Sequence, residues 1–217
     1  MSDSMAHLRR KISTAGDLQS VVRTMKAMAA SNIGQYEEAV RSLSDYNRTV
    51  ALGILAYFNN RSKAIQKDTF QKKHSLQTCA IVFGSDQGLV GQFNNTLVDF
   101  VSAHLHKTEG EKTIWAVGDR VKLLLLDQNF DTSTFFTVPS SVDAITPLVS
   151  QLLLKSEENI EAKIVDQVYV FHNQPNSSGV GYTPKVQQLF PLDENWRTNL
   201  SKLHWPTKKT PQVAGSE

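Results

Sequence analysis

The first 58 residues carry one apolar stripe with no proline to interrupt it, and this feature limits the fold more than any other. From Ser4 to Phe58 the apolar residues recur in steps of three and four, which is typical of an amphipathic or coiled-coil helix. At about 1.5 Å per residue, about 55 helical residues make a rod of roughly 80 Å. The sequence therefore predicts one long helix over residues 1–58, well beyond the usual helix of a compact domain. The stripe runs through Leu8, Ile12, Ala15, Leu18, Val22, Met25, Ala29, Ile33, Tyr36, Val40, Leu43, Tyr46, Val50, Ile54 and Tyr57.

Nothing later in the sequence is long enough to cover this stripe. The helices predicted further along are each shorter than about 20 residues and are needed to cover a sheet. The stretch from residue 196 to residue 217 contains two prolines and no heptad pattern. Because an apolar stripe has to be buried against a surface of similar length, we expect the rod to pair with another chain or with a helix that this sequence does not contain.

Residues 78–195 change to a pattern of short strands and helices. Five apolar runs are predicted strands, and helical stretches follow the first three of them. The last two strands are separated by a turn-forming stretch typical of a hairpin. This alternation indicates an α/β, Rossmann-like domain with a mainly parallel sheet and one closing antiparallel strand. The polar, lysine-rich residues 59–77 are predicted to be a linker. The predicted strands are 78–83, 113–117, 132–138, 163–173 and 183–192, and the predicted helices are 95–107, 119–128 and 141–159.

Local signals predict where two of these helices begin. Asn94 or Asn95 is expected to cap the first helix of the α/β region, because short polar side chains accept bonds from the free N–H groups of a first turn. Ser140 or Ser141 is expected to cap the third helix of that region in the same way. Pro147 falls near the start of the third helix, where it is expected to bend the chain.

Composition and charge exclude several classes of protein. The net charge of +2 conceals two basic ends, because residues 1–30 carry five Lys or Arg against two Asp, and residues 196–217, predicted to be an irregular basic tail, carry four against one Glu. The N-terminal charges have helical spacing and no interleaved aromatic residues, which indicates a solvated or partner-facing helix surface and not a nucleic-acid site. The single cysteine, Cys79, lies in an apolar run and is expected to be a buried small side chain. No apolar run approaches the roughly 20 residues of a membrane-spanning helix.

Three stretches of the sequence form recognisable motifs. Residues 8–12 read LRRKI and residues 24–33 read TMKAMAASNI. Residues 84–94 read GSDQGLVGQFN, and a weaker match, LFPLD, stands at 189–193. The first pair resembles the N-terminal helix of the γ subunit of F-type ATP synthases, the central-stalk rotor. The third stretch resembles that family's turn S-D-x-G-L-x-G-x-x-N after the first strand, and the matching positions are Ser85, Asp86, Gly88, Leu89, Gly91 and Asn94.

The resemblance implies a mechanical role without catalysis or cofactor. In that family the N-terminal helix pairs with a longer C-terminal helix in an antiparallel coiled coil, which turns inside a ring of α and β subunits. The α/β domain sits with the ε subunit on the ion-driven c-ring, so the membrane is reached only through the complex. Rotation then couples ion translocation to ATP synthesis or hydrolysis at the β subunits. The implied location is the cytoplasmic face of a bacterial inner membrane. The residues that determine whether H⁺ or Na⁺ is transported belong to the ring subunits, so this sequence does not show which ion is coupled.

The resemblance also implies a contact surface on the rotor shaft. Met25 and Lys26 match the shaft position that faces the catch region of the β subunits. Arg9, Arg10 and Lys11 add basic charge further along the same helix.

Three departures from the family pattern have consequences. Gln87 stands where a basic residue is usual, and Val90 stands where a cysteine or another small residue is common. Residues 13–23 are poorer in Lys and Asn than usual, which indicates a divergent branch such as the alternative ion-translocating type. The C-terminal helix of the family does not follow Glu217, as expected of a shortened copy, a fragment, or a chain whose second helix is supplied separately. The bare stripe should then make the isolated chain prone to self-association.

The glycine-rich turn raises an alternative, a nucleotide-binding Rossmann-like protein with a coiled-coil oligomerisation arm. The turn reads G-x-x-x-G-x-x-G, which is neither the G-x-G-x-x-G dinucleotide fingerprint nor a P-loop. The favoured interpretation is that Gly88 and Gly91 supply tight backbone geometry, while Asp86 and Asn94 tie the turn down. A scaffold or effector built on the same fold, without a rotary role, is a third hypothesis.

The remaining polar residues give no catalytic or metal-binding pattern. His104 and His106 are two apart, so they point to different faces of a helix instead of forming a metal pair. No serine stands in a G-x-S-x-G motif. The sequence therefore predicts no catalytic residue and no metal site. The other candidates are isolated or solvated, namely His7, His74, His172, His204, Glu157, Glu158 and Glu161.

Overall fold

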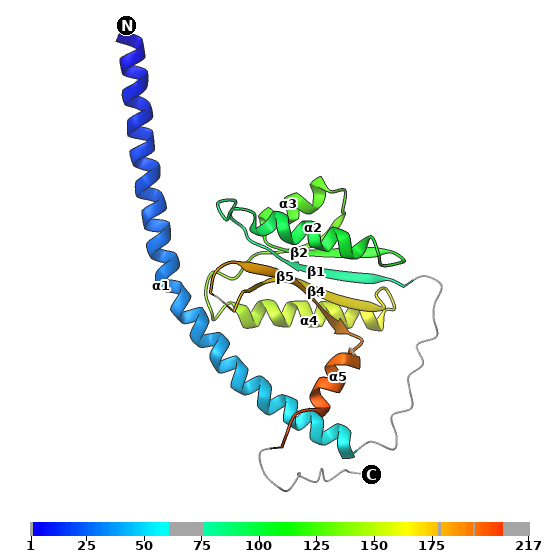
Figure 1. Ribbon diagram of the computed structural model, residues 1–217. Coiled ribbons are helices and arrows are strands. Elements are labelled where there is room, and N and C mark those ends of the chain that lie inside the picture. The colour runs from blue at the N-terminus through cyan, green and yellow to red at the C-terminus, as the bar shows by residue number, and fades with distance from the viewer. Residues whose placement is uncertain (1, 61–75, 178, 193, 206–217) are drawn as a thin grey trace. The chain divides into compact units, whose positions relative to one another are not determined.

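The computed structural model describes residues 2–60, 76–177, 179–192 and 194–205. The chain divides into two compact units, Met1–Gly53 and Ile54–Glu217. Helix α1 spans Ser2–Asn60, so the long helix that the sequence predicts is confirmed and continues to its end without a break (Figure 1). Most of the predicted linker at 59–77 lies outside the described residues.

Helix α1 exposes almost its whole length. Between residues 4 and 50 only Met25, Tyr36 and Ala39 are half-buried, and the other side chains are exposed. The apolar stripe is exposed with them, as at Leu18, which is 60% exposed, and Ile33, which is 59% exposed. Leu55 and Ala56, in the last turns of the helix, are buried and belong to the second unit. The first unit is therefore a helix with an uncovered apolar face.

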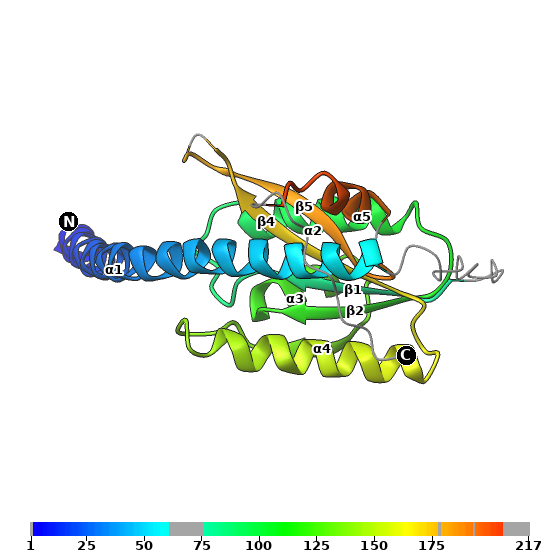
Figure 2. The same cartoon turned by 90° about the horizontal axis from the view of Figure 1, so that it is seen from below.

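The second unit is built on a five-stranded sheet with the strand order β3-β2-β1-β4-β5. The first four strands run parallel, and β5 pairs antiparallel with β4, which confirms the predicted sheet. Strand β1 matches its predicted range. The far end of the β4–β5 hairpin extends beyond the rest of the sheet (Figure 2). The strands are β1 Thr78–Phe83, β2 Lys112–Val117, β3 Thr132–Phe136, β4 Gln167–Pro175 and β5 Tyr182–Phe190.

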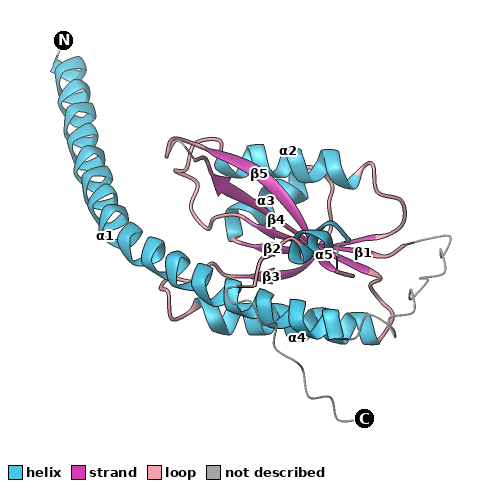
Figure 3. Cartoon of the chain, turned by 60° about the horizontal axis from the view of Figure 1, so that its bottom comes forward, coloured by secondary structure: helices cyan, strands magenta, loops and turns pink. Residues whose placement is uncertain are grey.

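Helices cover both faces of this sheet (Figure 3). Helices α2, Phe93–Leu105, and α3, Asp119–Asp127, lie on one face, and α4, Ile145–Glu161, lies on the other. The α2 and α3 side buries an apolar cluster that includes Leu97, Val101, Val121 and Phe171. The α4 side buries a second cluster around Trp115. Strand β1 contributes to both clusters, as expected of a central parallel strand whose two faces are covered.

Both predicted helix caps are wrong. Helix α2 begins at Phe93 after Gln92, and no side chain caps it, so Asn94 lies inside the first turn. Helix α4 begins at Ile145, because the chain first makes a turn in which the carbonyl of Ser141 accepts a bond from the N–H of Ala144. Pro147 is the third residue of α4, where the missing N–H would have no partner within the helix anyway.

Two boundaries near the C-terminal end also differ from the prediction. Strand β4 starts at Gln167 and not at residue 163, because Lys163 adopts φ 56° and the N–H of Ile164 bonds back to the carbonyl of Asn159. Residues 163–166 thus close the end of α4. The tail expected to be irregular from residue 196 instead contains helix α5, Glu194–Ser201. Leu200 of α5 is buried, and two apolar residues, Trp196 and Leu200, in so short a helix give little period to detect.

Candidate functional site

The family turn lies at the carboxyl edge of the sheet. It leaves β1 after Phe83, and the N–H of Gly84 still donates to the carbonyl of Val117 at 2.9 Å, which keeps the start of the turn on β2. The chain then passes residues 85–92 and enters α2. The motif residues therefore sit where three parallel strands end and two helices begin.

Asn94 fixes the start of the turn from inside α2. Its Oδ1 accepts a hydrogen bond from the backbone N–H of Ser85 at 2.9 Å, and its Nδ2 donates to the Oγ of Ser85 at 2.8 Å. The Ser85 hydroxyl in turn donates to the carbonyl of Gln87 at 2.8 Å. Asn94 is 2% exposed, so these bonds satisfy an amide that would otherwise be buried without partners. This explains why Asn94 is not the helix cap.

A second set of bonds ties the turn to the start of α3. The Oδ1 of Asp86 accepts a bond from the N–H of Asp119 at 2.9 Å, and the N–H of Arg120 donates to the carbonyl of Ser85 at 3.0 Å. A carboxylate at the first N–H groups of a helix is favourable, because it satisfies a free donor and complements the helix dipole. Gly118 lies against Ser85 with φ 117°, and an added Cβ would come within 2.9 Å of the Ser85 carbonyl carbon. The turn is thus braced on both sides.

The two motif glycines differ in what they supply. Gly91 adopts φ 58°, a left-handed conformation that suits glycine. Gly88 does not, and the nearest atom to an added Cβ there would be Arg120 Nε at 3.9 Å. The expectation of tight geometry therefore holds for Gly91 and is wrong for Gly88. Leu89, between them, is 79% exposed and points away from the core.

The β4–β5 hairpin lies beside this turn. The Nδ2 of Asn173 donates to the carbonyl of Phe93 at 2.9 Å, and the rings of Phe93 and Tyr182 meet edge to face with centroids 5.0 Å apart. At the hairpin tip, Asn176 bonds to the carbonyl of Val180 at 3.1 Å. No local motif marks these residues in the sequence, because their proximity follows from the strand order.

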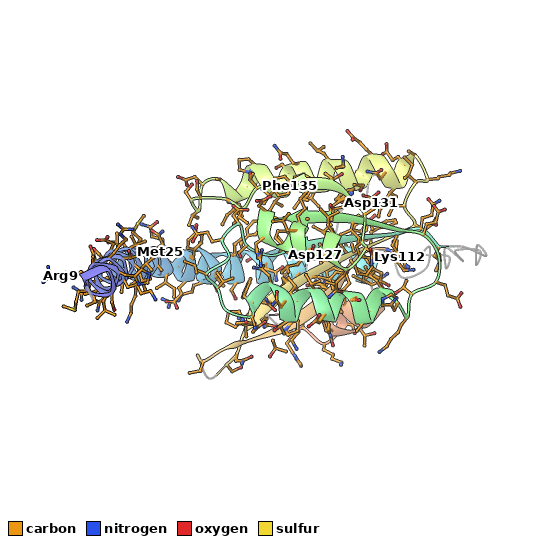
Figure 4. The ribbon with its side chains drawn as sticks, turned by 90° about the horizontal axis from the view of Figure 1, so that it is seen from above. Arg9, Met25, Lys112, Asp127, Asp131 and Phe135 are labelled. Atoms are coloured by element: carbon orange, nitrogen blue, oxygen red, sulfur yellow. The ribbon has the colours of Figure 1, made fainter. Side chains whose placement is uncertain are left out.

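The five candidate shaft residues all lie on α1. Arg9, Arg10 and Lys11 are exposed, and because successive helical residues are about 100° apart they spread over more than half of the helix circumference. Met25 is half-buried and lies in the apolar stripe, and Lys26 is exposed beside it. Figure 4 shows Arg9 near the N-terminal end of the helix and Met25 further along it. They belong to the first unit, whereas the turn belongs to the second.

Cys79 and His104 of the second unit lie in surroundings that disfavour their charged forms. Burial raises the pKa of the Cys79 thiol to about 12, and the nearby Lys155 charge opposes this only in part. Burial lowers the pKa of His104, and the charge of Lys107 lowers it further. The His104 ring packs against Phe171 at 5.3 Å between centroids. A thiol that resists ionisation and a histidine packed on aromatic rings are features of a core.

Residues 2–60, 76–177, 179–192 and 194–205 contain no group of three or more His, Cys, Asp or Glu that could hold a metal ion. None of the helices found there combines the length and the apolar character needed to cross a bilayer.

Comparisons with known proteins agree with the motifs. The ATP synthase family model matches residues 4–214. The ATP synthase γ chain of Brevibacillus brevis is 20% identical over 212 residues, which cover 94% of this chain and 71% of that protein. The mitochondrial ATP synthase subunit γ of Kluyveromyces lactis is 25% identical over 189 residues, which cover 86% of this chain and 61% of that protein. The chain thus matches only part of the length of these relatives.

A solved structure supports the fold. The central stalk and c-ring structure of the Tetrahymena thermophila mitochondrial ATP synthase contains a chain that matches with a TM-score of 0.55 and 20% identity, over 88% of this chain and 81% of that one. The family model covers nearly the whole sequence, and the motif turn has the braced geometry described above. The chain therefore belongs to the ATP synthase γ-chain family.

Proposed function

We propose that this chain is a noncatalytic central-stalk subunit of an F-type ATP synthase, coupling ion translocation through the c-ring to ATP synthesis or hydrolysis at the β subunits by rotation. The observation that carries the proposal is helix α1, whose 59 residues form a shaft with an exposed apolar stripe. Among the described residues the next longest helix, α4, has 17 residues and covers the sheet. Burial of the stripe therefore needs a second helix of similar length, packed along α1 as in a two-stranded coiled coil.

The shaft would act through contact energy and not through bond chemistry. A rotor changes the state of a neighbouring subunit only if it contacts the alternative states with different free energies. Met25 offers a flexible, polarizable side chain that adapts to more than one packing partner, and it lies in the stripe beside the charged Lys26. We assign these two residues to the shaft surface that meets the β subunits.

The basic residues Arg9, Arg10 and Lys11 would favour acidic partner surfaces. Three exposed positive charges on adjacent residues create a local positive potential that attracts carboxylates at a distance of about a Debye length, roughly 8–10 Å at physiological salt. Such a contribution is sensitive to salt and acts mainly on the rate of association.

The α/β domain would hold the chain on its partners near the membrane. In this proposal its partners are the α, β and ε subunits and the c-ring, and the chain is peripheral to the membrane, attached through the complex. The cytoplasmic face of a bacterial inner membrane is the location we propose. The domain supplies a rigid base, because the turn after β1 is tied to both α2 and α3.

A nucleotide-binding role for the glycine-rich turn has less support. The polar side chains that would be available to a phosphate or ribose are engaged with the chain's own backbone, Asn94 with Ser85 and Asp86 with Asp119. The turn therefore acts as a structural brace in this fold.

Reconstitution tests the proposal. The full chain is added to ATP synthase lacking its own γ subunit, and ion-coupled ATP synthesis is measured. Met25→Ser is compared with Met28→Ser, which changes an exposed methionine outside the stripe. We expect the wild type to restore coupling, Met25→Ser to reduce it and Met28→Ser to preserve it. Tight binding of ATP or NAD by the isolated chain in calorimetric titration, without assembly into the complex, would overturn the proposal.

A further inference from the structure

The apolar stripe of α1 repeats with the period of a coiled coil. Between Leu8 and Tyr57 every seventh residue is apolar, and the fourteen steps of the stripe cover 49 positions, a mean of 3.5 residues. A period of 3.5 keeps the stripe facing one partner helix along a left-handed supercoil. From Leu8 to Val50 the stripe is exposed or half-buried. It therefore fits a single helix of similar length, packed along its side.

The charges of α1 favour a second copy of the same helix that runs in the opposite direction. Residues 4–30 carry five Lys or Arg against one Asp, whereas residues 31–53 carry two Arg against three acidic side chains. Parallel copies would set one basic half against the other, whereas antiparallel copies set each basic half beside a weakly acidic one. The second unit begins at Ile54, so a parallel pair would also bring two α/β domains to the same end.

Two opposite charges lie on the same flank of the stripe. Lys26 directly follows the stripe residue Met25, and Glu37 directly follows the stripe residue Tyr36. Both charged side chains are exposed. The two-fold axis of an antiparallel pair brings the same flank of both helices together, whereas that of a parallel pair brings opposite flanks together. Only an antiparallel second copy therefore sets Lys26 of one chain beside Glu37 of the other.

The stripe and the charge pair place the two-fold axis at the same part of the helix. The exposed stripe from Leu8 to Val50 has its midpoint at residue 29, and Lys26 and Glu37 have theirs between residues 31 and 32. These midpoints differ by less than one helical turn of about 3.6 residues. An axis near residue 30 thus overlaps the stripes over their full length and also pairs the charges.

We infer that a second copy of this chain covers the stripe, in an antiparallel coiled-coil dimer whose two-fold axis lies near residue 30 of α1. The pair formed by Lys26 and Glu37 then occurs twice across the axis. Such a dimer of the free chain goes beyond the proposed function and does not depend on it. The dimer buries the surface that any other partner helix needs, so it has to separate before such a helix can bind.

Charge reversal tests the pairing. Dimer dissociation constants of the full chain are measured by sedimentation equilibrium at about 150 mM salt. Lys26→Glu or Glu37→Lys turns two attractive pairs into two repulsive ones, so each should raise the dissociation constant roughly fivefold to twentyfold. The double variant restores opposite charges and should return to within about threefold of the wild type. Glu38→Lys makes the same change on the side of the helix away from the stripe and should stay within about twofold.

Distances between spin labels test the orientation. Ser13→Cys and Ser31→Cys are labelled separately, and these exposed residues lie on the same side of the helix because they are eighteen positions apart. Cys79 is fully buried, so the label does not reach it. In the antiparallel dimer the two labels at position 13 should be roughly 50 Å apart, and the two at position 31 should be within about 20 Å. A parallel dimer would give short distances at both positions.

The results that would overturn the dimer are distinct from those that concern the proposed function. A monomer at all concentrations, a trimer or larger assembly, or a short distance at position 13 would exclude the antiparallel dimer. A double variant that dissociates as easily as the single variants would exclude the pairing of Lys26 with Glu37. The rotary role is tested separately by reconstitution, which none of these outcomes decides.

Discussion

Asn94 is the single residue on which the geometry of the family turn depends most. Its amide makes two hydrogen bonds to Ser85 and is almost fully buried. Asn94→Ala removes both bonds and leaves the N–H and hydroxyl of Ser85 without these partners, which should lower the free energy of unfolding by about 1–3 kcal/mol. Urea unfolding of the full chain, followed by circular dichroism, measures this change.

The neighbouring Asn95 is a matched control for that substitution. Asn95 is exposed, and its Nδ2 donates only to the side chain of Gln92 at 2.8 Å. Asn95→Ala should therefore change the free energy of unfolding by no more than about 0.5 kcal/mol. Equal effects of the two substitutions would show that the bonds to Ser85 contribute nothing to stability.

His104 makes the stability of the domain depend on pH. Burial against Tyr169 and Phe171 lowers the pKa of the folded-state imidazole, and the Lys107 charge adds to this. As pH falls through the unfolded-state value of about 6.5, the unfolded chain takes up a proton before the folded one does, so stability is lost between that pH and the lower folded-state pKa. His104→Gln should remove this part of the pH dependence. Urea midpoints for both proteins at about pH 7.5 and pH 5 measure it, and equal pH slopes would contradict the prediction.

At the scale of elements, the sequence predicts well what depends on a long repeated pattern. Helix α1 and the parallel sheet could be predicted, because a long apolar stripe or a buried run of residues is still recognisable when single positions depart from the pattern. The start of α3 at Asp119 was predicted, but the starts of α2 and α4 were not, because the structure uses Asn94 to hold Ser85 and places a turn before Ile145. Those two starts depend on how a side chain bonds within a turn and on a turn that several residue types can form.

The contacts at the carboxyl edge could not be predicted for the same reason. Asn173 and Phe93 are 80 positions apart and meet because β4 lies next to β1. The motif residues Asp86 and Asn94 could be found from the sequence, and so could their general role in the turn. Asp119, the partner of Asp86, could be named only once the strand order was known.

The apolar stripe of α1 should drive self-association of the isolated chain. Leu18 and Val22 lie one turn apart on the stripe and are 60% and 56% exposed. Leu18→Gln with Val22→Gln keeps good helix formers and removes apolar surface, so it should shift the chain toward the monomer. Sedimentation velocity over a range of concentrations measures this shift. Met28→Gln, at a 62% exposed position outside the stripe, should have a much smaller effect, and an equal effect would contradict a role for the stripe itself.

At the scale of the whole molecule, the exposed residues offer contacts of two chemistries. The first unit carries exposed basic residues and an apolar stripe on a helix. The second unit carries a turn braced by hydrogen bonds, with the exposed apolar side chain of Leu89 in it. Charges steer partners over several ångströms and lose their effect in salt, whereas apolar contacts act at short range and persist. Salt dependence therefore offers a way to measure the contribution of the charged residues separately from that of the apolar surfaces within one assembled complex.

The basic end of α1 should control the rate at which the chain joins the complex. Arg9→Gln with Arg10→Gln removes two exposed charges, and Arg41→Gln with Arg48→Gln removes two of the same kind elsewhere on the helix. If Arg9 and Arg10 face acidic partner surfaces, the first variant should associate several-fold more slowly at low salt and show a weaker salt dependence than the wild type. The second variant should remain within about twofold of the wild type. Stopped-flow association with ATP synthase lacking its γ subunit, at about 20 and 200 mM salt, measures both rates. Equal slowing by the two variants would mean that only the net charge of the helix matters, and that Arg9 and Arg10 are not at a specific contact.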